Sequence, residues 1–517
     1  MSSLSVPVHV EVSLLPTCTA DDADIKEEAL NLLAGGRYIL KDGPVDFASS
    51  SVLSQSAKSI NIVDMDDSLP SGVSFWQGDF RVHIYRLSQE GPEQEMIDGA
   101  GEEEEIAACD QWILPSASLE GVWESLVLEQ GVKNHLLEYA TTALLFTDKG
   151  VSKNVISWNR VVLLHGPPGT GKTSLCKALA HKLSIRLGDR YSSGQLLEIN
   201  AHSLFSKWFS ESGKLVQRLF EHIMELADDD DSLVCVLVDE VESLTAARSA
   251  AMGGNEPSDA VRVVNAVLTQ IDNLRQRDNV LILTTSNVSE AIDLAFVDRA
   301  DIKQYIGLPT APARYQVLHS CLEELARVGI VAPPFYLPPS FSKAVELTSA
   351  CSSTASSPPL VEASGMSGTE ARSAACVGVV GGAQTFSTAA RQNERESARK
   401  AIASGARTDA GGDVVMDSGG GVVEDSDVRT GAGGDAAVFG QGVAGSTRTG
   451  LHMAAEALLK IAELAEGLSG RALRKLPFQA HAFYVQRPSC TLVEFLSAMT
   501  RAVQKELGDR QSLEINR

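Results

Sequence analysis

Hydrophobic residues in the middle of the chain form short continuous runs, and each run is followed by a polar loop and an amphipathic stretch. The runs are "VVLLH", "QLLEIN", "LVCVLVDE", "VLILTTSN" and "IKQYIGLP". Continuous apolar runs of this length are typical of strands buried on both faces, and intervening helices favour parallel strands. The pattern predicts an α/β fold with a parallel five-stranded sheet over residues 112–310.

The first hundred residues show a different, alternating pattern. Three β-like runs, "VPVHVEVSL", "SINIVDM" and "FRVHIYRL", accompany one helical stretch, "DADIKEEALNLLAGG", and the region ends in the acidic run "GEEEE". Runs of like charge are typical of solvated segments. We therefore predict a small α+β N-terminal domain over 1–100 and an acidic linker over 101–111.

A third change of composition interrupts the helical C-terminal part. Residues 351–450 contain eighteen of the 42 glycines and only two aromatic residues. Such a segment buries too little apolar surface to offset the entropy lost on ordering, which predicts a disordered insertion rich in Gly, Ala and Ser. Helical periodicity before and after it predicts one small helical domain, built from residues 311–350 and 451–517.

Charge and cysteine usage exclude several classes of function. The net charge of −23 over 517 residues argues against a general nucleic-acid surface, since phosphate neutralisation needs clustered Lys and Arg. The eight cysteines are scattered without metal-ligand spacing, which indicates reduced thiols. Neither a signal peptide nor a membrane-spanning run is apparent, so we expect no membrane partner.

The stretch "VVLLHGPPGTGKTSLCKAL" fits the pattern GxxxxGK[ST] between a strand and a helix. Backbone N–H groups in such a loop converge on phosphate oxygens, Lys172 reaches the β- and γ-phosphates, and Thr173 ligates Mg²⁺. The alternative is a glycine-rich turn with a chance lysine. The predicted ATP-binding residues are Gly166, Pro167, Pro168, Gly169, Thr170, Gly171, Lys172, Thr173 and Ser174.

Hydrolysis needs further groups, which the third and fourth apolar runs supply at their ends. Asp239 follows "LVCVLV" and is predicted to hold Mg²⁺ partly through water, while Glu240 polarises the attacking water. The alternative is that both merely solvate a strand end. Asn287 ends the run "VLILTTSN"; it either orients water beside the γ-phosphate or forms a simple turn.

These motifs together resemble a known family. The segments "GPPGTGKT", "VLVDE", "TTSN", "DLAFVDRAD" and "GLSGRALRKL" are similar to AAA+ ATPases. Longer segments, "HSLFSKWFSESGKLV", "DEVESLTAARSA", "EPSDAVRVVNAVLTQID" and "FVDRADIKQYIGLP", resemble the pachytene checkpoint protein 2 family, also called thyroid receptor-interacting protein 13. The resemblance covers almost everything except residues 351–450. It implies a homo-hexameric ring that uses ATP to partly unfold HORMA-domain proteins of the spindle checkpoint and the meiotic chromosome axis.

The resemblance assigns roles to two arginines. Arg299 matches the arginine finger that reaches the neighbouring subunit's γ-phosphate; the alternative is a structural pair with Asp298 or Asp301. AAA+ relatives often carry two arginines here, whereas this chain has Asp298 near the other position. Arg471 matches the sensor in the helical lid; the alternative is a charge beside a helix start, since Ser469 resembles a cap.

The resemblance also implies a central-pore loop that grips an extended peptide by packing its aromatic rings. The alternative is that the two aromatic residues of this loop, Trp208 and Phe209, lie in the core. A second, less certain pore-facing loop contains Gly253, Gly254 and Asn255. The predicted pore-loop residues are Trp208 and Phe209, flanked by Lys207, Ser210, Glu211 and Gly213.

The predicted function is therefore an ATP-driven remodeller of HORMA-domain proteins, with a HORMA-fold adaptor as a further candidate partner. One alternative is a nucleotide-gated scaffold that holds partners through its N-terminal domain without substrate-stimulated hydrolysis. Another is a motor on DNA, which the acidic charge disfavours. The resemblance implies a nuclear location at chromosomes and kinetochores, with the cytoplasm as a second location.

Overall fold

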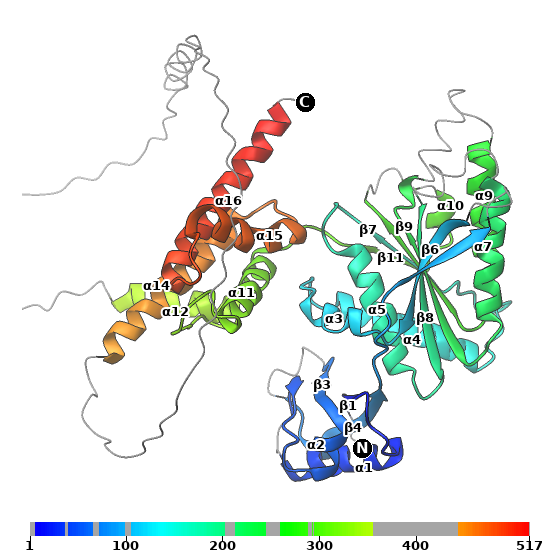
Figure 1. The fold of residues 1–517 in the computed structure, drawn as a ribbon, viewed down its shortest axis with the longest axis horizontal. Coiled ribbons are helices and arrows are strands. Elements are labelled where there is room, and N and C mark those ends of the chain that lie inside the picture. The colour runs from blue at the N-terminus through cyan, green and yellow to red at the C-terminus, as the bar shows by residue number, and fades with distance from the viewer. Residues whose placement is uncertain are drawn as a thin grey trace, which may run out of the picture. The chain divides into compact units, whose positions relative to one another are not determined.

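The structure is a computed structural model and describes residues 6–36, 40–65, 72–98, 105–201, 212–243, 259–287, 292, 294–354 and 443–515. None of the helices in these ranges has the length and apolar character that crossing a membrane requires. The described residues form an N-terminal domain, a sheet domain and a helical domain (Figure 1).

The N-terminal domain is a four-stranded sheet of order β2-β3-β1-β4 with helices on one face. Valines at alternate positions of β1, from Val8 to Val12, are fully buried in a core shared with Ile25 and Leu53. Ser50 caps α2, because its Oγ accepts a hydrogen bond from Leu53 N. The elements are β1 (Val6–Leu14), α1 (Asp22–Gly36), β2 (Gly43–Pro44), α2 (Ser51–Ser56), β3 (Ala57–Val63), η1 (Phe75–Gln77) and β4 (Gly78–Tyr85).

The sheet domain contains the predicted five parallel strands, in the order β11-β7-β10-β9-β8, which confirms the α/β fold class. Two antiparallel strands, β6 and β5, extend the sheet beyond β8. The strands are β5 (Glu93–Asp98), β6 (Glu105–Leu114), β7 (Val161–His165), β8 (Ser193–Asn200), β9 (Ser232–Asp239), β10 (Val280–Ser286) and β11 (Ile302–Tyr305).

Helices cover both faces of this sheet, as the continuous apolar runs predicted (Figure 1). Successive residues of β7 show the alternation: Val161 packs with α7 and α9, whereas Val162 packs with α4 and α5. The helices are η2 (Ala117–Leu119), α3 (Val122–Ser125), α4 (Val132–Asp148), α5 (Lys172–Arg186), α7 (Ser212–Ala227), α9 (Asp259–Leu274) and α10 (Leu294–Val297).

The predicted domain boundary at residue 100 and the linker over 101–111 are wrong. β5 and β6 pair with each other, and β6 pairs with β8, so both strands belong to the sheet domain. The sequence "EIAACDQWIL", most of which was assigned to the linker, forms β6, whereas residues 101–104 of the charge run lie outside the described residues. The run of like charge drew the prediction away from the strand that begins at its last residue, Glu105.

The helical domain joins segments from both sides of the predicted insertion in one apolar core. Tyr315, Leu318, Leu458, Leu473 and Phe495 are all 0% exposed in this cluster. α12 continues to Thr354 and α14 begins at Val443, so helices occupy both ends of the range given to the insertion; residues 355–442 lie outside the described residues. The elements are α11 (Ala311–Arg327), α12 (Phe341–Thr354), α14 (Val443–Leu464), α15 (Gly470–Ala480), η4 (His481–Val485) and α16 (Leu492–Ile515).

Candidate functional site

The glycine-rich loop joins the end of β7 to the start of α5, as the sequence motif predicted. Gly166 has φ +144°, and a Cβ atom there would lie 2.2 Å from the backbone oxygen of Ile306. Gly171 adopts the left-handed conformation, with φ +98°, at the N-cap of α5. Only glycine fits both requirements, so the loop can bend tightly and aim the first turn of α5 at an anion.

Lys172 is buried, with 4% of its surface exposed, and its partners in the loop are neutral. Its Nζ donates to the carbonyl oxygens of Gly166, at 2.9 Å, and Pro167, at 2.8 Å. Burial lowers the pKa of Lys172, although Glu242 and Asp239 act in the opposite direction. A buried ammonium group held by carbonyls beside a helix N-terminus fits a phosphate group.

The next residue, Thr173, lies against the end of β9. Its Oγ1 donates a hydrogen bond of 2.9 Å to Oδ1 of Asp239, and Thr285 Oγ1 donates to the same oxygen. Hydroxyl and carboxylate oxygens are the ligands that Mg²⁺ prefers, so this donor set fits the predicted metal. Thr285, in the polar tip of β10, was not predicted, although it belongs to the quoted segment "TTSN".

Glu240 and Asn287, which are 47 residues apart in sequence, meet at the tips of β9 and β10. Asn287 Nδ2 donates to Oε1 of Glu240 at 3.4 Å, and Glu240 N donates to Thr285 Oγ1 at 3.2 Å. Asn287 N donates to Oε1 of Glu242 at 3.1 Å. Glu242 was not predicted as a site residue from the sequence. Its position only two residues after Glu240 could have indicated that it lies at the same strand end. The side chains of Glu240 and Asn287 are therefore in contact, and their roles in hydrolysis stay predictions.

Arg299 follows α10 and binds neither of the two aspartates considered from the sequence. Its Nε and Nη2 donate to the two carboxylate oxygens of Asp272 on α9, at 2.9 and 2.7 Å, and its Nη1 donates to Ala295 O at 2.7 Å. Asp301 instead accepts from Asn159 N and other donors at the start of β7. The partner was missed because Asp272 lies 27 residues earlier, on another element.

The start of α15 places Arg471 next to the phosphate loop. Arg471 N donates to Gly169 O at 3.0 Å, and Ser469 caps the helix by accepting from Ala472 N. The structure is therefore compatible with both interpretations of Arg471, as a sensor in the lid and as a charge beside a helix start. The helix start carries a cap, and its backbone also contacts the phosphate loop. A small cavity beside Thr170 is also lined by Val132 of α4 and Gly470 of α15.

The predicted phosphate-loop residues Pro168, Thr170 and Ser174 are contiguous with these groups, and Thr170 Oγ1 donates to Pro167 O. Of the predicted pore-loop residues, Gly213 lies in the first turn of α7 and not in a loop. The other five, Lys207, Trp208, Phe209, Ser210 and Glu211, lie outside the described residues, as do Gly253, Gly254 and Asn255. The pore loops thus stay predictions from the sequence.

Comparison with known proteins gives matches along nearly the whole chain. The family described as "ATPase family associated with various cellular activities (AAA)" matches residues 162–308. "TRIP13 N-terminal domain" matches residues 3–90, and "TRIP13-like, AAA+ ATPase lid C-terminal domain" matches residues 441–507. The Gallus gallus protein named pachytene checkpoint protein 2 homolog is 42% identical over 98% of this chain and 95% of its own length. The chain belongs to the pachytene checkpoint protein 2 family of AAA+ ATPases.

Other members of this family agree. The Homo sapiens pachytene checkpoint protein 2 homolog is also 42% identical, over 98% of this chain and 95% of its own length. The solved structure of C. elegans PCH-2 has a TM-score of 0.61 at 30% identity, covering 97% of this chain and 100% of that one. Membership of the pachytene checkpoint protein 2 family confirms the AAA+ fold with an N-terminal domain and a C-terminal helical lid, and supports an ATPase.

Proposed function

We propose that this chain forms a hexameric ring that hydrolyses ATP to unfold part of a HORMA-domain protein, by pulling a peptide segment through its pore. The observation that carries the proposal is the convergence of Lys172, Thr173, Asp239, Glu240 and Asn287 at one edge of the sheet. These groups come from three elements and match the parts that phosphoryl transfer to water requires. HORMA-domain proteins are the substrates that the family resemblance implies.

Each group has a defined task in this proposal. The first turn of α5 and Lys172 bind the phosphates, and Glu240, held by Asn287, takes a proton from the attacking water. Mg²⁺ bound at Thr173 and Asp239 supplies positive charge that offsets the charge on the phosphates. Arg471 contacts the nucleotide from the helical domain. Trp208 and Phe209 then grip the peptide.

Replacing Glu240 with Gln tests the assignment of the base. Because the amide cannot accept the proton, we expect turnover to fall by about 10²–10⁴-fold while ATP binding and ring assembly persist. Glu198→Gln, the same change on neighbouring strand β8, is the matched control and keeps turnover. Undiminished hydrolysis by the Glu240→Gln protein would remove this residue from the mechanism.

Substrate conversion needs a separate test. Purified chain is mixed with a HORMA-domain protein, with and without a HORMA-fold adaptor, and both ATP turnover and substrate conformation are followed. We expect stimulated turnover and conversion, and we expect Trp208→Ala to stop conversion while sparing basal hydrolysis. Full conversion by that variant would contradict the gripping role.

A nucleotide-gated scaffold is the second candidate, and one contact favours it. Asp272 and Ala295 O of the same chain already bind the guanidinium of Arg299, which the hexamer model assigns to the neighbouring subunit's phosphate. A scaffold predicts no stimulation of turnover by substrate in the same assay. We further propose that the protein works in the nucleus, which localisation of the tagged full chain tests.

A further inference from the structure

Strand β1 of the N-terminal sheet is buried on both of its faces from Val10 to Leu14. Val8, Val10 and Val12 of β1 face the apolar core, while Glu11 and Ser13 on the opposite face are only 5% and 0% exposed. Helix α5 of the sheet domain packs against β4, the parallel neighbour of β1. Polar side chains on this second face are therefore buried against another domain.

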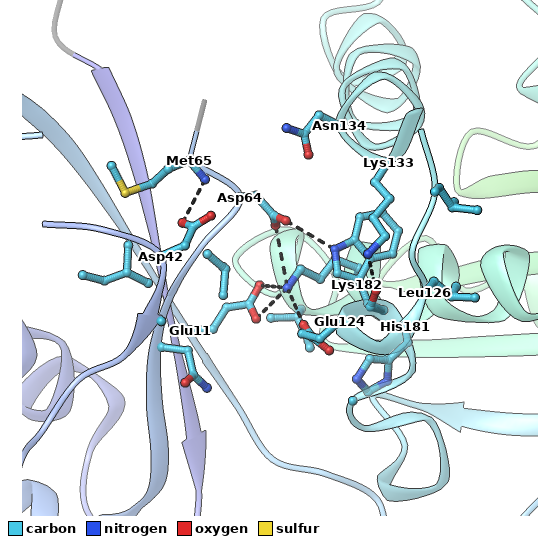
Figure 2. A pocket seen from close by; sticks show the side chains of 18 of the residues that line it. Glu11, Asp42, Asp64, Met65, Glu124, Leu126, Lys133, Asn134, His181 and Lys182 are labelled. Carbon is cyan, nitrogen blue, oxygen red and sulfur yellow. Dashed lines mark hydrogen bonds and ion pairs between the residues drawn. The ribbon is translucent and has the colours of Figure 1, made fainter. Parts of the chain in front are cut away.

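The centre of this contact is Lys182, near the C-terminal end of α5, with 2% of its side chain exposed. Its Nζ lies 2.8 Å from both carboxylate oxygens of Glu11. Asp64, just after β3, and Glu124 of α3 lie 3.7 and 3.6 Å from the same Nζ. Figure 2 shows the lysine pointing between these three carboxylates, two of which come from the N-terminal domain.

Arg186, one helical turn further along α5, adds a second cation to the cluster. Its Nη2 donates to Oδ2 of Asp64, and its Nε lies 3.5 Å from Oε1 of Glu11. Trp123 Nε1 donates to the other oxygen of Asp64 at 3.3 Å. Two cations of one helix thus hold two carboxylates of the N-terminal domain, all of them largely shielded from solvent.

A cavity of about 720 Å³ borders this cluster and is lined by both domains. Asp42 and Asp64 of the N-terminal domain face Lys133 and Asn134 of α4 across it (Figure 2). In the described part of the chain, the apolar cores of the two domains share no residue. Buried charges, more than apolar packing, therefore determine how the two domains are held together.

The same helix that makes this contact begins at the phosphate loop. α5 runs without interruption from Lys172 to Arg186, and its sequence, "KTSLCKALAHKLSIR", contains neither Gly nor Pro. An α-helix rises about 1.5 Å per residue, so the two ends lie roughly 20 Å apart on one rigid rod. Any displacement of the phosphate-binding end is carried to the buried cluster.

We propose that Lys182 and Arg186 form a latch that fixes the N-terminal domain to the phosphate-loop helix through Glu11 and Asp64. The N-terminal domain then moves as one body with α5 in every nucleotide state. A protein held by the N-terminal domain is thereby kept at a fixed position relative to the ATPase machinery. This last consequence rests on the proposed function, whereas the latch itself does not.

The test measures the distance between the two domains in the full chain. Spin labels are introduced by unnatural amino acids at Val52 on α2 and at Val155 in the sheet domain, which are 40% and 83% exposed. Double electron–electron resonance is recorded at pH 8 without nucleotide, with ADP and with a non-hydrolysable ATP analogue. We expect one narrow distance distribution, with the same mean, in all three states of the unsubstituted protein.

Lys182→Met breaks the latch, because it leaves the carboxylates of Glu11 and Asp64 without their shared cation. We expect its distance distribution to be at least twofold broader. Lys177→Met is the matched control: it removes another ion-paired lysine of α5, which is half-buried and whose 2.6 Å partner Glu198 lies within the sheet domain. The control keeps the narrow distribution. Equal widths in the two variants, or a broad distribution in the unsubstituted protein, would overturn the latch.

Two further measurements keep the result interpretable. Glu11→Gln, which has nearly the same shape, breaks the latch from the N-terminal side if Lys182→Met does not fold, and it too must broaden the distribution. Basal ATP turnover is expected to stay within about twofold in all three variants, while conversion of a HORMA-domain protein falls only when the latch is broken. If even the unsubstituted chain converts no substrate, the proposed function fails, and the distances still decide the latch.

Discussion

Two buried lysines on helix α5, Lys172 and Lys182, show how differently one helix can use the same side chain. Lys172 donates to two backbone carbonyls, and burial lowers its pKa. Burial also acts to lower the pKa of Lys182, but attraction to Glu11, Asp64 and Glu124 outweighs it and raises that pKa. The charge of Lys172 is still available to an anionic ligand, whereas protein carboxylates already neutralise that of Lys182.

This difference separates binding from structure along a single element. A cation with neutral partners gains most when phosphate arrives, because only then is its charge balanced in a site of low dielectric constant. A cation surrounded by carboxylates gains nothing from a further ligand, and removing it leaves those carboxylates buried and unbalanced. The two ends of α5 should therefore respond to mutation in opposite ways.

The largest expected effect is on catalysis at the first lysine. Lys172→Met removes the charge that binds the phosphates, and we expect ATP turnover to fall by roughly 10³-fold. Stability without nucleotide should change less than in Lys182→Met, since the lost partners are two neutral carbonyls and no carboxylate is left without its cation. Phosphate release and urea denaturation measure the two quantities. Turnover within tenfold of the unsubstituted protein would contradict the assignment.

Lys182→Met should show the reverse pattern, with a large loss of stability and little change in ATP turnover. Breaking a buried ion pair by removing one partner costs about 3–5 kcal/mol, so we expect a loss of this order in the free energy of unfolding with basal turnover retained. Urea denaturation of Lys177→Met provides the comparison, because its pair is partly exposed and the cost should be smaller. An equal loss of unfolding free energy in both variants would show that the buried cluster at Lys182 stabilises the protein no more than the half-buried pair at Lys177.

The pH dependence of stability sharpens the comparison further. Burial raises the pKa of Glu11 from its ordinary value of 4.5 to about 7, against the attraction of Lys182. A raised carboxyl pKa contributes stability that is present below pH 4.5 and lost as the pH rises through 7. The stability of the unsubstituted protein relative to Glu11→Gln should therefore fall between pH 5 and pH 7 and then level off.

Denaturation at several pH values in this range checks the trend. Burial lowers the pKa of nearby His83 and His181 to about 4 each, which destabilises the fold in acid, but both histidines are present in both variants and their contributions cancel to first order. Lys182, Arg186, Asp64, Glu124 and Tyr85 are also common to both variants. A difference that does not change with pH would contradict the raised pKa.

The smallest effect is expected at a second ion pair between the N-terminal domain and the sheet domain, which is exposed to solvent. It joins β3 to the segment before α3. Lys58 Nζ lies 2.7 Å from Glu120, and their side chains are 46% and 39% exposed. Exposed pairs contribute about 0–1 kcal/mol, so Lys58→Met should barely change the urea midpoint. A cost similar to that of Lys182→Met would show that burial is not what distinguishes the latch.

The sequence predicted most of the chemistry at the phosphate end of α5. The motif from Gly166 to Thr173 is contiguous, and Asp239 and Asn287 each follow a buried run, so local pattern placed them at one edge of a parallel sheet. The five strands of that sheet were found for the same reason. Their hydrophobic periodicity is a property of neighbouring residues and needs no knowledge of distant contacts.

The tertiary structure decided what the other end of the helix does. Lys182 and Glu11 are 171 residues apart in sequence, and each looks like an ordinary solvated charge in its own segment. The β5–β6 hairpin and the pairing of Arg299 with Asp272 were missed in the same way. A charge run or a lone charged residue carries no local sign of its partner, because burial and pairing arise only when distant elements pack together.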